Sequence, residues 1–323
     1  MAEILQQAGA WTFDGDTVRI VPGHHKSVHR LRRLLGELAV PLEAVAGISY
    51  EPGRRSGWLR LRLRHGADPL LQAAGGRLPD AADPYRLEVE SDRAGVAEYF
   101  VDEVRNALLL EQVPVEQPCD RYLLPGPAVP LSVQGTDGTA SFDGERVQIE
   151  WNWMAESSKT SAGPRTFALR ELESVEWTPA IGWENGCLRF RPKGAHAVLK
   201  PDHDPNCLVL WGIRQAKDTS SVLLAAAVTA RLPHPSAGGS GSGAAALPPA
   251  GGPAEAEPAE PAEPAASAAP ARAGSGAGSG AGSGDADHDV LLRRLRELGE
   301  LHREGVLTDE EFATAKQAVL RRF

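Results

Sequence analysis

The sequence predicts an α+β protein in which two tandem repeats of antiparallel strands, each closed by a C-terminal helix, precede a disordered linker and a two-helix hairpin. First, a block at residues 9–20 returns at 138–149 with the shared pattern Phe-Asp-Gly-x-x-Val-x-Ile. Second, strand-like alternation follows in both copies and each copy ends in a helical pattern. Third, an Ala/Gly/Pro/Ser-rich stretch separates the second copy from a short apolar tail. The predicted boundaries are 9–110 and 134–232 for the repeats, 236–284 for the linker and 287–323 for the hairpin.

Each repeat is expected to open with a β-hairpin. The pairs Asp14-Gly15 and Asp143-Gly144 lie between apolar positions and can adopt the positive φ angles of a tight turn. Further along the first copy, Leu59, Leu61 and Leu63 alternate with arginines. This period of two predicts a half-buried strand whose outer face is basic.

A helix is expected to close each repeat. In the first copy, Val96, Phe100, Val104 and Leu108 lie four residues apart and form one apolar stripe, with Ser91 or Asp92 as the expected N-cap. The second copy ends similarly over residues 220–230. A curved antiparallel sheet or barrel with one C-terminal helix is typical of a pleckstrin-homology-like (PH-like) module. Since each copy has roughly a hundred residues, each is expected to have its own core.

Composition narrows the function classes. The chain has 43 acidic and 34 basic residues and a net charge of -9, which disfavours binding to nucleic acid or to anionic lipid through overall charge. No apolar run is long enough for a transmembrane helix, and the N-terminus lacks a signal-peptide pattern. Cys119, Cys187 and Cys207 have no metal-site spacing, and Cys187 replaces Trp58 of the first copy, which favours a packing role. We expect a cytoplasmic protein with reduced thiols.

The linker and the tail differ sharply in composition. Residues 236–284 lack the apolar side chains needed to offset the entropy of ordering, so they predict a flexible tether with a reach of roughly 40 Å. At Thr308 the tail has a capping box with Glu311, which predicts the start of a second helix. A hairpin of this length needs further apolar contacts to be stable. We therefore expect residues 287–323 to associate with a second copy or with another protein, through Leu291, Leu295, Leu298, Leu307, Phe312 and Val319.

Two family resemblances follow from these motifs. The run Gly-Val-Leu-Thr-Asp-Glu-Glu-Phe at 305–312 resembles the SHOCT (short C-terminal) domain, which implies oligomerisation or protein interaction. The tandem region resembles the mostly actinobacterial domain-of-unknown-function family 4429, through Trp-Thr-Phe-Asp-Gly at 11–15 and Asp-Pro-Leu-Leu at 68–71. The second copy lacks the Asp-Pro-Leu-Leu block. This resemblance supplies no catalytic residues.

The strongest local charge pattern is a basic segment between Thr17 and Gly36. One interpretation is a site for an anionic lipid, a phosphate or an acidic partner; the other is solvated surface balanced by acids elsewhere. The outer face of the Leu59–Leu63 strand would extend the patch if it lay beside this segment. The candidate residues are Lys26, Arg30, Arg32, Arg33, Arg60 and Arg62. His24, His25 and His29 lack the pattern of a metal site, so no metal is expected.

A second candidate surface is aromatic. Trp151 and Trp153 lie two apart and would share one face of a strand, either as a recognition surface or as core. No nucleophile elbow, phosphate loop or dinucleotide fingerprint is present outside the linker, so we expect no catalytic residue and no cofactor. The sequence thus predicts a non-enzymatic scaffold. The alternative is a peripheral membrane or anionic-ligand binder that uses the basic segment.

Overall fold

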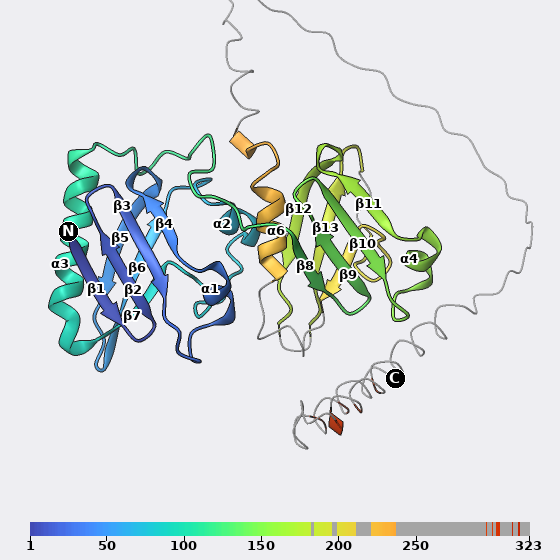
Figure 1. The fold of residues 1–323 in the computed structure, drawn as a ribbon, viewed down its shortest axis with the longest axis horizontal. Coiled ribbons are helices and arrows are strands. Elements are labelled where there is room, and N and C mark those ends of the chain that lie inside the picture. The colour runs from blue at the N-terminus through green and yellow to red at the C-terminus, as the bar shows by residue number, and fades with distance from the viewer. Residues whose placement is uncertain are drawn as a thin grey trace, which may run out of the picture. The chain divides into compact units, whose positions relative to one another are not determined.

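The computed structural model describes residues 1–236 except 182–183, 196–198 and 211–220, together with Leu295, Gly299, His302, Arg303, Phe312 and Lys316. The chain divides into two compact units, Met1–Ala245 and Ala246–Phe323. The first unit contains both repeats, built mainly of antiparallel strands with few helices (Figure 1). The predicted α+β class is confirmed.

Repeat 1 consists of a four-stranded sheet, a three-stranded sheet and a long closing helix. The sheet orders are β1-β2-β3-β4 and β5-β6-β7. The elements are β1 (Ala2–Gln6), β2 (Gly9–Phe13), β3 (Thr17–Pro22), α1 (Arg30–Leu35), β4 (Leu38–Pro41), β5 (Val45–Glu51), β6 (Ser56–Leu63), α2 (Pro69–Ala74), β7 (Arg86–Glu90) and α3 (Ala94–Leu110).

Repeat 2 follows the same plan without a described equivalent of α2. Its sheet orders are β11-β10-β9-β8 and β12-β13-β14. The elements are β8 (Leu131–Gln134), β9 (Gly138–Phe142), β10 (Arg146–Trp151), α4 (Ser157–Ala162), β11 (Arg165–Ala168), β12 (Leu172–Thr178), β13 (Gly186–Pro192), β14 (Cys207–Leu210) and α6 (Ser221–Thr229). Within the described residues no strand pairing joins the two sheets of a repeat, so the closed barrel stays a prediction.

The predicted hairpin turns are confirmed. Asp14 Oδ1 accepts a hydrogen bond of 2.8 Å from the Thr17 amide, and Asp143 Oδ1 accepts one of 2.7 Å from the Arg146 amide. The glycines that follow have φ angles of 114° and 112°, in the region that favours glycine. Each repeat also has a strand before the duplicated block, namely β1 in repeat 1 and β8 in repeat 2. The duplicated block does not predict these strands, because it begins only at Gly9 and Gly138.

The alternation in β6 is confirmed, because Leu59, Leu61 and Leu63 are buried and the intervening arginines are exposed. Phe100, Val104 and Leu108 of the α3 stripe are also buried and Val96 is half-buried, but the predicted N-cap of this helix is wrong. The chain forms a 3-10 turn at Ser91–Arg93, and α3 begins only at Ala94. Ser91 and Asp92 therefore lie inside a turn, and Arg93 at the helix boundary makes no side-chain capping bond.

Each repeat has its own buried cluster, as predicted, but the cluster of repeat 2 also takes in residues of α1 and α2 from repeat 1. Helix α2 of repeat 1 packs against α6 and β12 of repeat 2 (Figure 1). Leu70, Ala73 and Ala74 of α2 belong to the same buried apolar cluster as residues 222–228 of α6. Polar contacts also cross this junction. Arg77 donates to the Trp177 carbonyl over 2.7 Å and to the Thr178 hydroxyl over 3.4 Å, and the His234 ring lies 3.0 Å from the Gly66 carbonyl.

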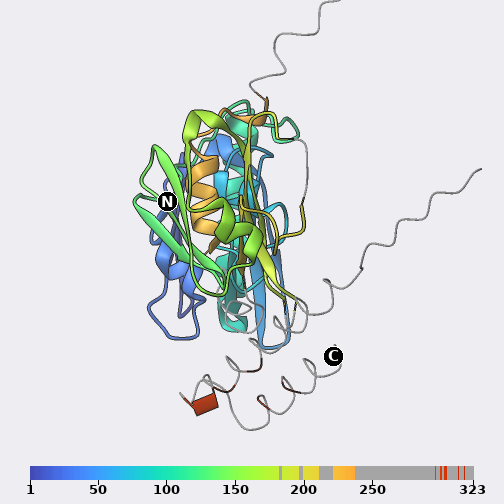
Figure 2. The ribbon, with the colours of Figure 1, turned by 90° about the vertical axis from the view of Figure 1, so that its right-hand side faces the viewer.

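The composition of α6 explains this packing. Residues 222–228 are all apolar and buried, and the helix also runs alongside the strands of its own repeat (Figure 2). A helix that is apolar on all sides needs neighbours on all sides. Helix α2 supplies one of them, and it comes from the Asp-Pro-Leu-Leu block, where Asp68 caps the helix by accepting from the Leu70 amide over 2.8 Å. None of the helices among the described residues has the length and apolar character needed to cross a membrane.

Candidate functional site

A cluster of charged side chains, most of them buried, occupies equivalent positions in both repeats. Each cluster has a base on the short helix before the fourth strand, an arginine on the middle strand of the second sheet, and an aspartate before that sheet's last strand. The equivalent pairs are Arg32 and Lys159, Arg60 and Arg189, and Asp83 and Asp204. Sequence spacing does not predict this cluster, because its members lie far apart in the chain.

In repeat 2 the central base is Lys159, which is 0% exposed. Its Nζ lies 2.5 Å from Asp137 Oδ2 and 2.7 Å from the Cys207 carbonyl oxygen, and 5.0 Å from the centre of the Trp151 ring. Burial raises the pKa of Asp137, and the Lys159 charge acts in the opposite direction. Each of these two buried charges therefore needs the other to offset the cost of leaving water.

A second ion pair completes this cluster. Arg189 Nε lies 3.0 Å from Asp204 Oδ2, and the Oδ1 atom of the same aspartate accepts a hydrogen bond of 2.9 Å from the Asn206 amide. Asp83 accepts in the same way from the Tyr85 amide over 2.9 Å in repeat 1. Both aspartates thus hold the turn that leads into the last strand of the sheet.

In repeat 1 the cluster is less completely paired. Arg32 is 8% exposed, and its buried Nη2 has no hydrogen-bond partner among the described residues. Burial lowers the pKa of Arg32, against the attraction of Asp83. Burial raises the pKa of Asp83, against the opposing charges of Arg86, Arg60 and Arg32. Three arginines therefore face one desolvated carboxylate.

The residues of the predicted basic patch differ in their exposure to solvent. Lys26, Arg30 and Arg33 are exposed, but Arg32 is buried, because α1 turns Leu31 and Arg32 inward. This corrects its placement on a solvated surface. His25 and His29 bond locally, His25 Nδ1 with Ser27 Oγ at 2.7 Å and His29 Nδ1 with the Leu31 amide at 3.2 Å.

The two strand arginines of the patch lie on the outer face of β6. Both Arg60 and Arg62 are exposed. The positive charges of Arg60 and of Arg32 in the basic segment both lower the pKa of Asp83. Asp80, which forms an ion pair with Arg86, adds a second acid beside the patch. Arg60 and the basic segment therefore interact with the same carboxylate, and the nearby acids offset part of the positive charge of the patch.

The two tryptophans of repeat 2 do not share a strand face. Trp151 ends β10, is half-buried and donates from Nε1 to the Gly163 carbonyl over 2.9 Å. Trp153 lies in the following turn and is 73% exposed, because Asn152 accepts from the Met154 amide over 2.8 Å and bends the chain. Trp153 is the accessible aromatic side chain of the pair.

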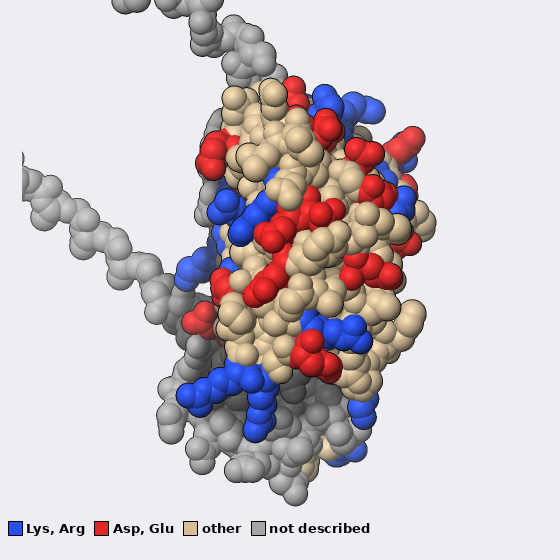
Figure 3. All heavy atoms as spheres, turned by 90° about the vertical axis from the view of Figure 1, so that its left-hand side faces the viewer, with Lys and Arg blue, Asp and Glu red and all other residues tan. Residues whose placement is uncertain are grey.

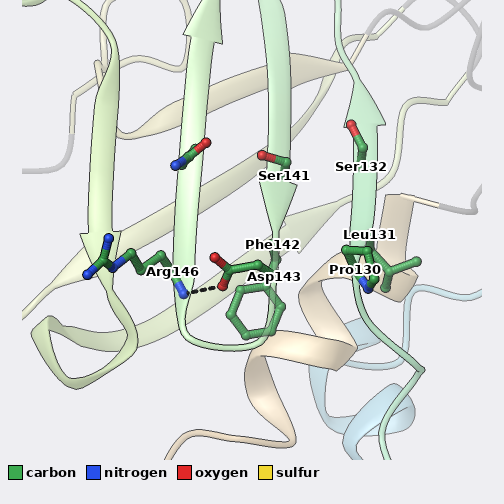
Figure 4. A pocket seen from close by; sticks show the side chains of 8 residues that line it. Pro130, Leu131, Ser132, Ser141, Phe142, Asp143 and Arg146 are labelled. Carbon is green, nitrogen blue, oxygen red and sulfur yellow. Dashed lines mark hydrogen bonds between the residues drawn. The ribbon is translucent and has the colours of Figure 1, made fainter.

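A shallow hollow of about 290 Å³ lies beside the Asp143 turn on β8, β9 and β10 (Figure 4). Ser141 lies opposite Ser132 on one side and Gln148 on the other, so two hydroxyls and an amide form a polar row across the sheet. Arg146 and Asp143 lie at its edge, joined through the Arg146 amide. The hollow therefore combines this polar row with the apolar side chains of Pro130 and Leu131.

Exposed charge is distributed unevenly over repeat 1. The face that includes α3 carries acidic side chains across its middle, with basic side chains mainly around them (Figure 3). Glu98 and Asp102 are exposed on this helix, next to Tyr99, which is 53% exposed. This face is poorly suited to an anionic membrane.

Two predicted residues of the tail, Leu295 and Phe312, are helical and half-buried. The rings of His302 and Phe312 stack with their centroids 4.6 Å apart, which brings the two predicted helices into contact. The other predicted tail residues lie outside the described residues, namely Leu291, Leu298, Leu307 and Val319.

Comparison with known proteins identifies two regions. Residues 11–105 and 140–229 match the family described as "Domain of unknown function (DUF4429)". Residues 293–320 match the SHOCT family, described as "Short C-terminal domain". No curated protein matches the chain.

Proposed function

We propose, from the premise that the chain belongs to the DUF4429 family, that it is a non-enzymatic scaffold whose fused repeats form a binding platform and whose SHOCT domain associates with a second copy or a partner protein. The observation that carries this proposal is the buried junction between the repeats, where α2 of repeat 1 lies in the core of repeat 2. Because α2 and α6 pack in one buried cluster, the two repeats present their surfaces at a fixed spacing. A fixed spacing suits simultaneous contact with a large partner.

Several finer features belong to the same proposal. The four-stranded sheet, three-stranded sheet and closing helix of repeat 1 support a PH-like module, and three free cysteines fit a reducing cytoplasmic location. Trp153 is the proposed aromatic contact for a protein ligand, because an exposed indole can bury a large apolar area on binding. Association of the tail would raise the local concentration of these platforms.

Light scattering tests the role of the tail. We expect the full chain to have a larger molar mass than a chain that ends at Ser236, which keeps the His234 contact with Gly66. Phe312→Ala should reduce the association, because this ring packs on His302, whereas the exposed Lys316→Ala variant is the matched control. Equal masses for the full and shortened chains over a wide concentration range would remove self-association from the proposal.

An anionic-ligand site on repeat 1 is the second candidate. It is favoured by the exposed Lys26 and Arg33 of the basic segment, and by the buried Nη2 of Arg32, which has no hydrogen-bond partner among the described residues. Co-sedimentation with anionic vesicles tests it: Lys26→Glu with Arg33→Glu should abolish binding, and Arg170→Glu on repeat 2 should not. Unchanged partition of the double variant would reject this candidate.

A further inference from the structure

Two cysteines occupy diagonal positions on the outer face of repeat 2. Cys187 on β13 lies opposite Val209 on β14, two residues beyond Cys207. Leu188 and Leu208 are 0% exposed in the core, so the alternation of side chains places both cysteines on the opposite face of the sheet. A hydrogen bond between the two thiols shifts the pKa of both. The two sulfurs are therefore direct neighbours.

Repeat 1 supports this contact independently. Its residues at the equivalent positions are Trp58 and Arg86, which have the same diagonal relation on β6 and β7. The Arg86 guanidinium carbon lies 4.7 Å from the centre of the Trp58 ring. The diagonal thus brings side chains together in both repeats: a cation–π pair in the first and two thiols in the second.

The two thiols differ in access and in acidity. Cys187 is half-buried, whereas Cys207 is 0% exposed. The hydrogen bond with Cys207 lowers the pKa of Cys187, with Thr178 and the charge of Arg189 acting in the same direction. The same hydrogen bond and burial raise the pKa of Cys207. Since the thiolate is the nucleophile, Cys187 is the first of the two to react.

We propose that Cys187 and Cys207 are a redox-active pair that hydrogen peroxide oxidises to an intramolecular disulfide. The Cys187 thiolate attacks one peroxide oxygen and the O–O bond breaks, which leaves a sulfenic acid on Cys187 and releases the other oxygen as water after it takes a proton from solvent. The Cys207 sulfur then attacks the Cys187 sulfur. The S–S bond forms, and the hydroxyl group leaves as water with the proton of Cys207. The two thiols lose two electrons, which the peroxide gains.

The fold permits the sulfurs to approach each other. A disulfide needs an S–S distance of about 2.05 Å, so the strands must move together slightly. In the order of the described strands β14 is an edge strand beside β13, which leaves it freer to shift than a central strand. The Cys207 carbonyl also accepts from Lys159 over 2.7 Å. A shift of Cys207 on oxidation would therefore change the surroundings of the buried Lys159–Asp137 pair.

Peroxide treatment of the folded, full-length chain tests the proposal. We expect the intact mass to fall by about 2 Da, and a peptide map to show one link between Cys187 and Cys207 that dithiothreitol reverses. Cys119→Ser is the matched control and should form the same link. In Cys207→Ser, the sulfenic acid on Cys187 should persist and react with dimedone, whereas Cys187→Ser should give neither product.

Three results would overturn the proposal: oxygen addition without a disulfide in the folded wild-type chain, a disulfide that includes Cys119, or dimedone labelling on a residue other than Cys187. Far-ultraviolet circular dichroism establishes that each variant is folded. Should a serine variant fail to fold, the peptide map of the wild-type chain alone still decides between a Cys187–Cys207 link and its absence.

Discussion

Replacing Leu70 with alanine tests whether the two repeats unfold as one body. Leu70 is 3% exposed in α2 and belongs to the cluster that contains α6. The other buried apolar side chains at this end of the junction, Ala73 and Ala74, are small, so Leu70 supplies much of the apolar volume that α2 contributes. Truncation of a buried leucine costs about 2–5 kcal/mol, because it removes burial and leaves a cavity. We expect a loss of about 3 kcal/mol in the free energy of unfolding.

Native-state hydrogen exchange measures this loss separately in each repeat. Peptides that cover β2 report on repeat 1 and peptides that cover β12 report on repeat 2. If the repeats are one cooperative unit, Leu70→Ala lowers the protection of both by the same free energy. Leu109→Ala, at a site 76% exposed on α3, is the control and should change stability by less than about 0.5 kcal/mol. A loss confined to one repeat, or one below about 1 kcal/mol, would refute the cooperative coupling of the repeats through this junction.

Two further substitutions probe the buried charges. Lys159→Met should lower the free energy of unfolding measured in urea by about 3–5 kcal/mol, because it leaves Asp137 buried without its cation. Adding Asp137→Asn should restore part of this loss. Lys193→Met, at an exposed site, is the control and should have little effect. A cost of Lys159→Met no larger than that of Lys193→Met would contradict the ion pair. Asp68→Asn should flatten the dependence of stability on pH: burial raises the pKa of Asp68 in the folded chain, so its contribution is complete below the unfolded value of about 4 and is lost as pH rises through the folded value. Parallel curves for the wild-type chain and Asp68→Asn between pH 4 and pH 7 would show that Asp68 does not titrate in this way.

Local patterns in the sequence were sufficient to predict the repeated hairpins and the main strand faces. A turn such as Asp14-Gly15 depends on its own backbone and on amides two and three residues away, and burial in β6 follows the alternation of Leu59 and Leu61. The N-cap of α3 was wrong because a 3-10 turn and an α-helix share the same local preferences. Boundaries of this kind shift by a residue or two without changing the apolar stripe.

The candidate sites depend on contacts that local patterns do not contain. Lys159 lies in a serine-rich segment that resembles a solvated loop, yet Asp137 and the Cys207 carbonyl enclose it from two other parts of the chain. Arg32 looked like one more member of a basic run, and only the packing of α1 shows that its side chain is turned inward. The thiol pair required the register of β13 and β14, which spacing in the sequence does not fix.

The differences between the repeats are best understood as complementary parts of one junction. Residues 64–85 join β6 to β7 and include α2, whereas the shorter segment 193–206 joins β13 to β14. Helix α3 has polar residues such as Asp102 on its exposed side. Residues 222–228 of α6 are all apolar, and α2 packs against this helix. The block found only in copy one therefore stabilises the closing helix of copy two. The proposed binding surfaces of the two repeats therefore differ in side chains that this packing leaves exposed, such as Arg33 in repeat 1 and Trp153 in repeat 2.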